Sequence, residues 1–504
     1  MTVLMAAATL NAKPVDFKRA SDVAIKASYV LFQEQHPEMR GLQVVPYYHF
    51  EAEKSPYQNI YCFDMYYTYE DSCVAVGFIV VSGDDVATPI LAFSTDQRYP
   101  SQINPSAKAM LDSYDQQIAA AKTKGVKQDA NVAAKWARLE SIDNWNDVVA
   151  LTAKGDFYDD NIPRLLGNMR WGQGKPYNTH CPGNAVTGCV ATAFSMIMNY
   201  WNWPEHGWGS HSYNGADNPA VYGNWTYGVQ SADFGSTYYD WDHMPDYVMI
   251  NSPEEEIEAV STLCYHVGVA LDMNYNPNGS GCWSLPEYAI FDTSLHLATT
   301  VGADYRIPKH FGYKYSYAGM RDSIGNDSIW LNMLYTSLAE GKPIYYAGWA
   351  KENNEAGHSA TSGHGYVLDG YFSDATDSNF FHINWGWNGS SDGFFKLDAM
   401  TPSGSDFTQW HGAIIGLEPD STYTGYNPEG IREQQQPNYT VNCRDGRVVV
   451  QGCAQQPVAI FDIMGRLVGQ RAATANDSWS LAAPRGTYIV RVGMQPAQKV
   501  VNIY

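Results

Sequence analysis

Residues 187–201 read TGCVATAFSMIMNYW, and this stretch determines the fold of the largest part of the chain. Its apolar side chains recur every three to four positions, which predicts an amphipathic helix. The repeating positions are Val190, Phe194, Ile197 and Trp201. Thr187 is a suitable N-cap, and Pro204 marks the end of the helix. Cys189 is therefore expected in the first turn of a helix.

A cysteine in the first helical turn is a candidate nucleophile. Backbone N–H groups at a helix N-terminus carry about half a positive charge. This charge favours the thiolate over the thiol, especially beside a cationic side chain, and the thiolate is the reactive form. Because most cysteines simply pack as small apolar residues, the assignment of Cys189 depends on its partners.

A histidine between two glycines is the candidate base. The stretch SGHGYVLDG at 362–370 places His364 at the beginning of a strand-like run. Its small neighbours leave the imidazole accessible, and a pKa near neutrality lets it stabilise a thiolate and later protonate a leaving amine. His358 lies close by in the sequence, and composition alone does not distinguish the two histidines.

Two further stretches contain groups that such a pair needs. In FHINWGWNG at 381–389, Asn384 can accept the imidazole N–H, and the indole of Trp385 can shield that bond from water. In WGQGKPYN at 171–178, the Gln173 amide can donate to a developing oxyanion together with the Cys189 backbone N–H. An aromatic core strand and a solvated glutamine are the structural alternatives.

Together these motifs resemble the streptopain family of bacterial cysteine proteases. The resemblance rests on TGCVATA at 187–193, GHGYVLDG at 363–370, NWGWNG at 384–389 with DGFF at 392–395, and QGKPYN at 173–178. It implies a papain-like α+β fold of two subdomains that needs no cofactor. It also implies that Cys189 is the nucleophile, His364 the base, Asn384 and Trp385 the orienting pair, and Gln173 an oxyanion donor, and it leaves His358 without a role.

An N-terminal α+β unit is expected over residues 21–125. Apolar residues at helical spacing from Val23 to Leu31 precede strand-like runs at 41–50, 60–67 and 73–81 and a helix at 106–122. Its stretches FIVVSGD at 78–84 and PIL at 89–91 resemble the inhibitory prodomain of the family. The polar, weakly patterned residues 126–160 are predicted to form a linker that is cut during maturation.

The C-terminal residues 438–504 are predicted to form a small all-β domain after a linker at 420–437. Short strand-like runs occur at 448–450, 458–463 and 488–492. The pattern VAIFDIMGRLV followed by PRGTYIVRV resembles the C-terminal sorting domain of type IX secretion, which implies secretion machinery as a partner. A binding or spacer module is the alternative. Cys443 and Cys453 can either form a bridge or remain two thiols.

Charge and hydropathy limit the partners of the protein. Its formal charge of −21 argues against nucleic acid, since that binding needs Lys and Arg to neutralise phosphates. No apolar run approaches the ~20 residues that span a bilayer. Residues 1–20 contain a short apolar core that fits either a signal-peptide remnant or an ordinary N-terminal segment.

The sequence therefore predicts an inhibitory prodomain, a catalytic domain at 161–419 and a β-domain. The function expected is a secreted or surface-bound cysteine endopeptidase, made as a self-inhibited zymogen, that cleaves polypeptides through a thioester. A Cys/His amidase or transamidase on a related fold and a non-catalytic surface adhesin are the two alternatives.

Overall fold

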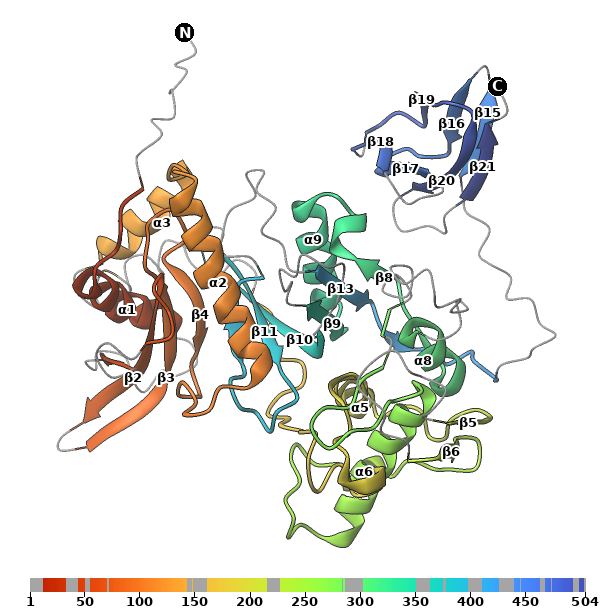
Figure 1. Cartoon of the computed structure of the whole chain (residues 1–504), viewed down its shortest axis with the longest axis horizontal. Helices are drawn as coiled ribbons and strands as arrows, with labels where there is room; N and C mark the ends of the chain where they lie inside the picture. The colour runs from red at the N-terminus through yellow and green to blue at the C-terminus, as the bar shows by residue number, and fades with distance from the viewer. Residues whose placement is uncertain are drawn as a thin grey trace. The chain divides into compact units, whose positions relative to one another are not determined.

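The computed structural model describes most of the chain (Figure 1). The described residues are 12–32, 44–49, 55–69, 72–142, 147, 161–214, 227–282, 284–285, 302–349, 363–374, 378–397, 410–425, 439–444, 446–462, 467–472, 474–492 and 498–502. The chain divides into two compact units, Met1–Gly425 and Tyr426–Tyr504.

The first unit is built on one ten-stranded antiparallel sheet with the order β1-β2-β3-β4-β12-β11-β10-β9-β13-β8. Its strands are β1 (Val44–Tyr48), β2 (Ile60–Tyr69), β3 (Ser72–Ser82), β4 (Ile90–Ser94), β8 (Tyr317–Met320), β9 (Ile344–Trp349), β10 (Gly363–Asp374), β11 (Ser378–Asn384), β12 (Gly393–Phe395) and β13 (Trp410–Ile415). The expected prodomain strands and the catalytic strands are joined where β4 pairs with β12.

The N-terminal strands are accompanied, among the described residues, by the helices α1 (Phe17–Leu31), α2 (Pro105–Thr123) and α3 (Ala130–Glu140). Side chains cap them, as when Asp16 accepts a hydrogen bond from the Arg19 N–H at 2.8 Å. Helix α1 packs on β1, β2 and β3 with the apolar face that its spacing predicts. The predicted α+β character of this part is confirmed.

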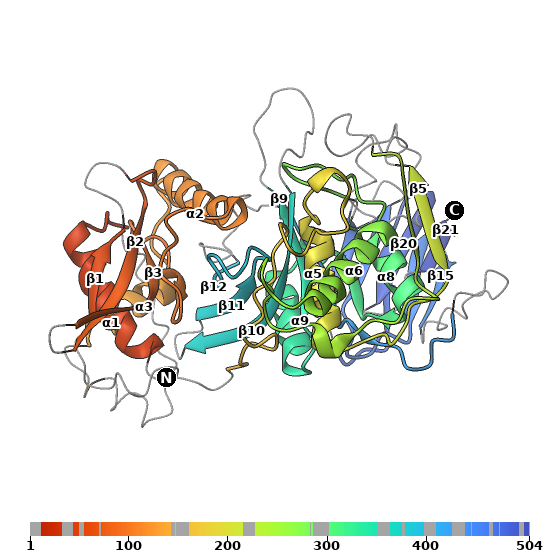
Figure 2. The ribbon, with the colours of Figure 1, turned by 90° about the horizontal axis from the view of Figure 1, so that it is seen from below.

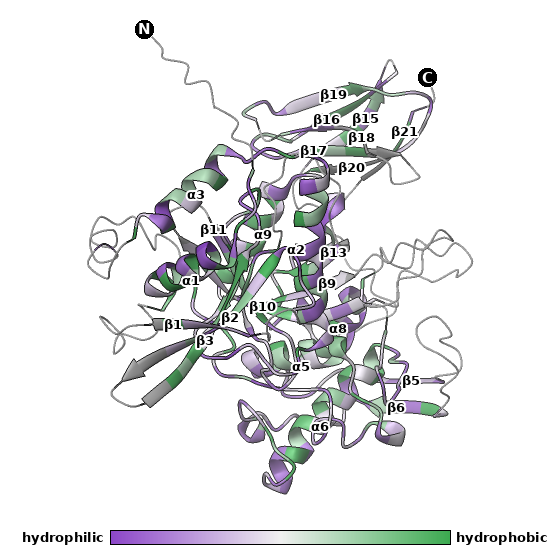
Figure 3. Ribbon diagram, turned by 60° about the vertical axis from the view of Figure 1, so that its left-hand side comes forward, coloured by the Kyte–Doolittle hydropathy of each residue, from purple (hydrophilic) through white to green (hydrophobic). Residues whose placement is uncertain are grey.

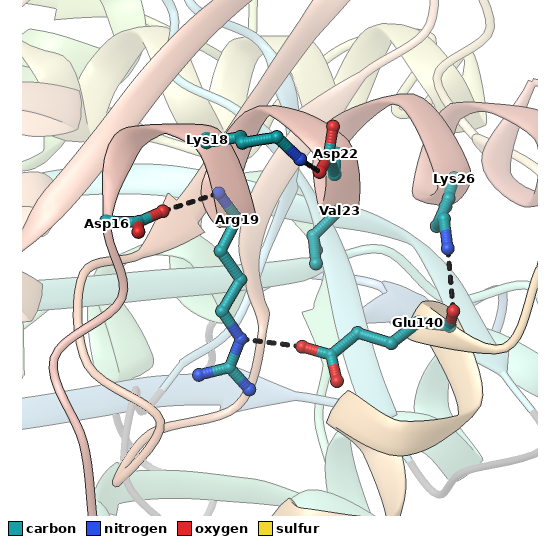
Figure 4. Close-up of a pocket in the computed structure, with 7 residues that line it drawn as sticks. All are labelled: Asp16, Lys18, Arg19, Asp22, Val23, Lys26 and Glu140. Carbon is teal, nitrogen blue, oxygen red and sulfur yellow. Dashed lines mark hydrogen bonds and ion pairs between the residues drawn. The ribbon is translucent and has the colours of Figure 1, made fainter.

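Both ends of the N-terminal part extend past the predicted boundaries. Helix α1 includes residues 17–20, and α3 lies inside the predicted linker. The two helices are tied together, since Arg19 donates to the Glu140 carboxylate and Lys26 to the Glu140 carbonyl, each at 2.6 Å. Figure 4 shows these ties among the side chains that line a hollow. The hollow has a volume of about 250 Å³, and its lining is charged except for Val23. The folded N-terminal part therefore reaches Glu140.

In the described part of the remainder of the unit lie the helices α5 (Cys189–Trp201), α6 (Glu254–Ala270), α8 (Ala303–Phe311) and α9 (Asp327–Ala339). Short 3-10 helices lie at Pro182–Asn184, Trp241–His243 and Arg321–Ser323. Two small sheets pair β5 (Ser210–Asn214) with β6 (Val229–Asp233), and β7 (Tyr313–Lys314) with β14 (Glu418–Pro419).

Helices cover both faces of the sheet around β9 and β10. Phe194 of α5 stacks on Tyr345 with ring centroids 4.5 Å apart, whereas Trp330 of α9 meets Tyr346. Successive strand residues point to opposite faces, so α5 and α9 lie on opposite sides. Helix α6 packs against α5 (Figure 2), and Figure 3 shows hydrophobic and hydrophilic residues mixed along the strands of the sheet. This arrangement is the expected α+β, papain-like architecture.

The second unit is all-β, as predicted. Its strands are β15 (Thr440–Arg444), β16 (Arg447–Gln451), β17 (Val458–Asp462), β18 (Leu467–Arg471), β19 (Ser478–Ala482), β20 (Gly486–Val492) and β21 (Gln498–Asn502). They form sheets of three and four strands around a core that includes Val448, Ile460 and Val490. Cys443 and Cys453 are both free thiols.

Within the described ranges, no helix is long and apolar enough to cross a membrane.

Candidate active site

Cys189 is the first residue of α5, as the sequence predicts. The N-cap, however, is Gly188 rather than Thr187. Gly188 has φ +90°, and a Cβ there would come within 2.8 Å of the Met273 sulfur, so only glycine fits. The Thr187 side chain lies inside the site, where its hydroxyl bonds that of Thr192 at 2.7 Å.

The Cys189 thiol is surrounded by groups that favour its ionised form. The Gly365 N–H points at Sγ with 3.3 Å between nitrogen and sulfur. Burial by itself raises the pKa of Cys189, but the charge of His364, its hydrogen bond and the N–H groups of Gly365 and Val190 outweigh burial. The net effect lowers the pKa below its ordinary value. The thiolate is therefore stabilised where a nucleophile is needed.

His364 is held by the backbone of the neighbouring strand end. It is the second residue of β10, and its Nε2 lies 3.1 Å from the carbonyl oxygen of Trp385. A carbonyl can only accept, so Nε2 carries the proton and donates it there. This tautomer leaves Nδ1 as the nitrogen that faces the sulfur. The structure thus brings Cys189 and His364 together as predicted.

Asn384 is buried beside this pair, but its amide is engaged elsewhere. Its Nδ2 donates to the Met169 carbonyl at 2.8 Å, and its Oδ1 accepts from the Gly386 N–H at 3.1 Å. The acceptor for the imidazole is therefore the carbonyl of Trp385, the next residue. In this structure Asn384 fixes the turn that follows β11 instead of bonding the ring directly.

The Trp385 indole packs within the core instead of covering the imidazole closely. Its ring lies 4.7 Å from that of Tyr366 and 6.3 Å from that of His364, and its Nε1 donates to the Ser391 carbonyl at 3.0 Å. The Trp385 N–H donates to Asp392 Oδ1 at 2.9 Å. Sequence reasoning assigned no role to Asp392, although it opens the quoted DGFF motif.

Gln173 lies on a loop whose backbone contacts the start of α5. Its Nε2 is buried and has no hydrogen-bond partner in the described part of the chain. The Gln173 carbonyl accepts the Thr187 N–H at 3.0 Å, which ties this loop to the start of α5. A buried donor without a partner costs free energy unless a ligand satisfies it. His358 lies outside the described residues.

Comparison with known families agrees with this geometry. Residues 171–395 match the model of the Peptidase C10 family, and residues 12–118 match the Spi protease inhibitor model. The chain belongs to the Peptidase C10 family. In this C10 peptidase the inhibitor match contains β1 to β4 and the peptidase match contains β9 to β12, so the two models divide the ten-stranded sheet at its β4–β12 junction. It is a cysteine peptidase with an inhibitor domain at its N-terminal end.

Several individual proteins are similar to this C10 peptidase. Streptopain of Streptococcus pyogenes is 29% identical over 353 residues, which cover 68% of this chain and 78% of the relative. The thiol protease/hemagglutinin PrtT of Porphyromonas gingivalis is 29% identical over 360 residues, 68% of this chain and 36% of PrtT.

Two solved structures from Prevotella intermedia also match. A fragment of prointerpain A is 28% identical with a TM-score of 0.49, covering 73% of this chain and 98% of the fragment. Active interpain A is 30% identical with a TM-score of 0.39, covering 51% and 96%. Residues 429–502 match a domain of unknown function, DUF6383.

The thiol–imidazole pair makes a prediction about alkylation. Because His364 lowers the pKa of Cys189, iodoacetamide should modify Cys189 well below pH 8.5, the ordinary value for a thiol. In His364→Ala, fewer groups oppose the effect of burial on the pKa of Cys189, so the pH profile of alkylation should move to higher pH. Peptide mass spectrometry as a function of pH measures the shift. A shift with His358→Ala but none with His364→Ala would contradict the assignment of the base.

Proposed function

We propose that this C10 peptidase is the latent precursor of an endopeptidase in which Cys189, His364 and Gln173 perform the chemistry. The observation that supports it best is the stabilised thiolate beside an oriented imidazole at the start of α5, with an unpartnered amide on the loop that is tied to Thr187. Polypeptides are the substrates, as the family and the inhibitor domain imply.

Acylation begins when the Cys189 thiolate attacks the carbonyl carbon of the scissile peptide. The carbonyl electron pair moves to oxygen, and the oxyanion accepts hydrogen bonds from Gln173 Nε2 and the Cys189 N–H. The oxyanion then collapses and the C–N bond breaks while the His364 imidazolium protonates the departing amine. The product is a thioester of Cys189.

Deacylation uses the same groups in reverse. Neutral His364 removes a proton from water, and the resulting hydroxide attacks the thioester carbon. The second oxyanion occupies the same site, and the C–S bond breaks to release the carboxylic acid and the thiolate. The Trp385 carbonyl keeps the imidazole oriented throughout, because Nε2 retains its proton in both forms of the ring.

Latency in this proposal comes from the N-terminal part, which shares both sheet and core with the peptidase. Phe93 of β4 is fully buried, with its ring 5.4, 5.2 and 5.0 Å from those of Phe372, Phe380 and Phe394. These three rings belong to β10, β11 and β12. We place the maturation cut after Glu140, between residues 141 and 160, because α3 is tied to α1.

We also place the protein outside the cell or at its surface. The support is the resemblance of the C-terminal β-domain to sorting domains and its separation as a compact unit. Deletion of residues 426–504 should leave the peptidase inside the producing cell without changing its activity after lysis. Immunoblots of cell and culture fractions measure this, and export at the normal level would rule the sorting role out.

The oxyanion role predicts a rate loss for Gln173→Ala. Removal of one oxyanion donor typically lowers kcat about 10²- to 10³-fold. The KM of a peptide substrate should change little, because the ground-state carbonyl makes little use of the donor. Steady-state kinetics per titrated thiol test this. A matched control is Gln230→Ala in β6, a buried glutamine of the peptidase part that lies outside the site. Equal kcat in the Gln173 variant and the wild type would remove this residue from the mechanism.

The zymogen role predicts self-processing. Wild-type protein should shorten from its N-terminal side on incubation and gain activity, whereas Cys189→Ala should remain at 56.0 kDa unless active enzyme is added. A tethered inhibitor has an effective concentration of roughly millimolar, so modest contacts are enough to block the site until the cut. Intact-mass measurement and a fluorogenic peptide assay follow both events. Full activity of the uncut wild type would contradict latency.

A further inference from the structure

The segment from Trp385 to Lys396 connects the imidazole to the inhibitor domain. At one end, the Trp385 carbonyl holds His364. At the other end, β12 pairs with β4, the Lys396 N–H donates to the Leu91 carbonyl at 3.0 Å, and the Asn104 side chain donates to the Ser390 carbonyl at 2.8 Å. Asp392 lies between these two sets of contacts and belongs to neither the sheet nor the residues that meet substrate.

Asp392 fastens the backbone of the residue that orients the base. Its side chain is buried, and Oδ1 accepts the Trp385 N–H at 2.9 Å. The carbonyl of the same Trp385 accepts Nε2–H of His364 at 3.1 Å. One residue thus carries both bonds, through its N–H on one side and its C=O on the other. A rotation of the Trp385 backbone would disturb both bonds.

We propose that Asp392 is a positioning residue for catalysis, whose carboxylate fixes the Trp385 backbone and thereby the direction of the His364 imidazole. The inference rests on the proposed role of His364 as the base. In this proposal a carboxylate orients the His364 imidazole by acting through a peptide group. The sequence had predicted that the Asn384 amide would do this.

The intervening loop shows why an anchor is needed. Four residues between Trp385 and Asp392 have positive φ, namely Gly386, Asn388, Gly389 and Ser391. Asn388 at +54° and Ser391 at +69° are not glycines, so the backbone is strained at each position and the conformation persists only if contacts enforce it. A hydrogen bond to a buried charged oxygen is among the stronger contacts available.

The charge state of Asp392 depends on its neighbours from three elements. Burial raises the pKa of Asp392 to about 7, while His382 of β11 and the Trp385 N–H oppose the rise. Asp369 of β10 and Asp96, which follows β4, act in the same direction as burial and contribute to this raised pKa. Protonation weakens Oδ1 as an acceptor, so the anchor should loosen as pH falls through neutrality. Removal of the inhibitor domain takes Asp96 away and favours the ionised carboxylate.

The test compares Asp392→Ala and Asp392→Asn with a matched control, Asp369→Asn. Asp369 is an equally buried carboxylate in the same cluster, but it binds His382 at 2.6 Å and the Leu166 N–H at 3.2 Å instead of Trp385. Each full-length variant is processed by a trace of affinity-tagged wild-type enzyme, which is then removed. An irreversible thiol reagent counts the active sites, and a peptide substrate gives kcat and KM.

We expect Asp392→Ala to lower kcat about 10- to 100-fold per site, the range for one hydrogen bond to a charged group, with KM within about 2-fold. Asparagine keeps an acceptor at the same place, so Asp392→Asn should recover most of kcat. The acid limb of the kcat–pH profile of Asp392→Asn should also be shallower than that of the wild type below about pH 7, because the ionisation of Asp392 is missing. Asp369→Asn should keep the wild-type kcat.

Two outcomes would overturn the positioning role. The first is that Asp392→Ala keeps the kcat of the wild type, or that Asp369→Asn loses as much kcat as Asp392→Ala does. The second applies if Asp392→Ala yields no titratable thiol. In that case, identical kcat–pH profiles of Asp392→Asn and the wild type would contradict the positioning role. An inactive wild type, or an active His364→Ala, would instead contradict the proposed function, so the two failures are distinguishable.

Discussion

A buried thiolate is stable only where positive charge and N–H donors replace water, and the arrangement of the first unit follows from this constraint at Cys189. Desolvation alone drives the thiol toward its neutral form, as it does for Cys62, Cys181 and Cys264, whose pKa values are all raised by burial. At Cys189 the helix start, the Gly365 N–H and His364 reverse the direction. The same burial therefore produces inert thiols in the core and a reactive one at the N-terminus of α5.

These stabilising groups come from elements far apart in the sequence, so the sheet must hold them in register. Helix α5 supplies the sulfur, β10 supplies both the imidazole and the Gly365 N–H, and the end of β11 supplies the Trp385 carbonyl. Strands β10 and β11 are neighbours, with Val367 opposite Asn384. Packing of Phe194 on Tyr345 fixes α5 against the adjacent β9. The site is thus precise because α5, β10 and β11 are fixed against one another, and because Asp392 holds the backbone of Trp385 where β11 ends.

The sequence predicted the parts of the site that depend on local patterns. The spacing of apolar residues placed Cys189 at the start of a helix, and glycines around His364 indicated an accessible imidazole on a strand. It could not predict that Gly188 caps α5, because that depends on the approach of Met273 from a distant loop. It also could not predict that the Asn384 amide would bond Met169, since this contact joins residues 215 positions apart.

The junction of β4 with β12 was hidden for a similar reason. Each strand alone reads as a short hydrophobic run, and no local signal states that one continues the sheet of the other. The junction determines what a cut after α3 can change. Cleavage lowers the effective concentration of the inhibitor domain from roughly millimolar to that of a free protein. It leaves the pairing of β4 with β12 and the packing of Phe93 untouched. Loss of the tether and loss of the interface are therefore separate events, and only the second frees the segment that orients His364.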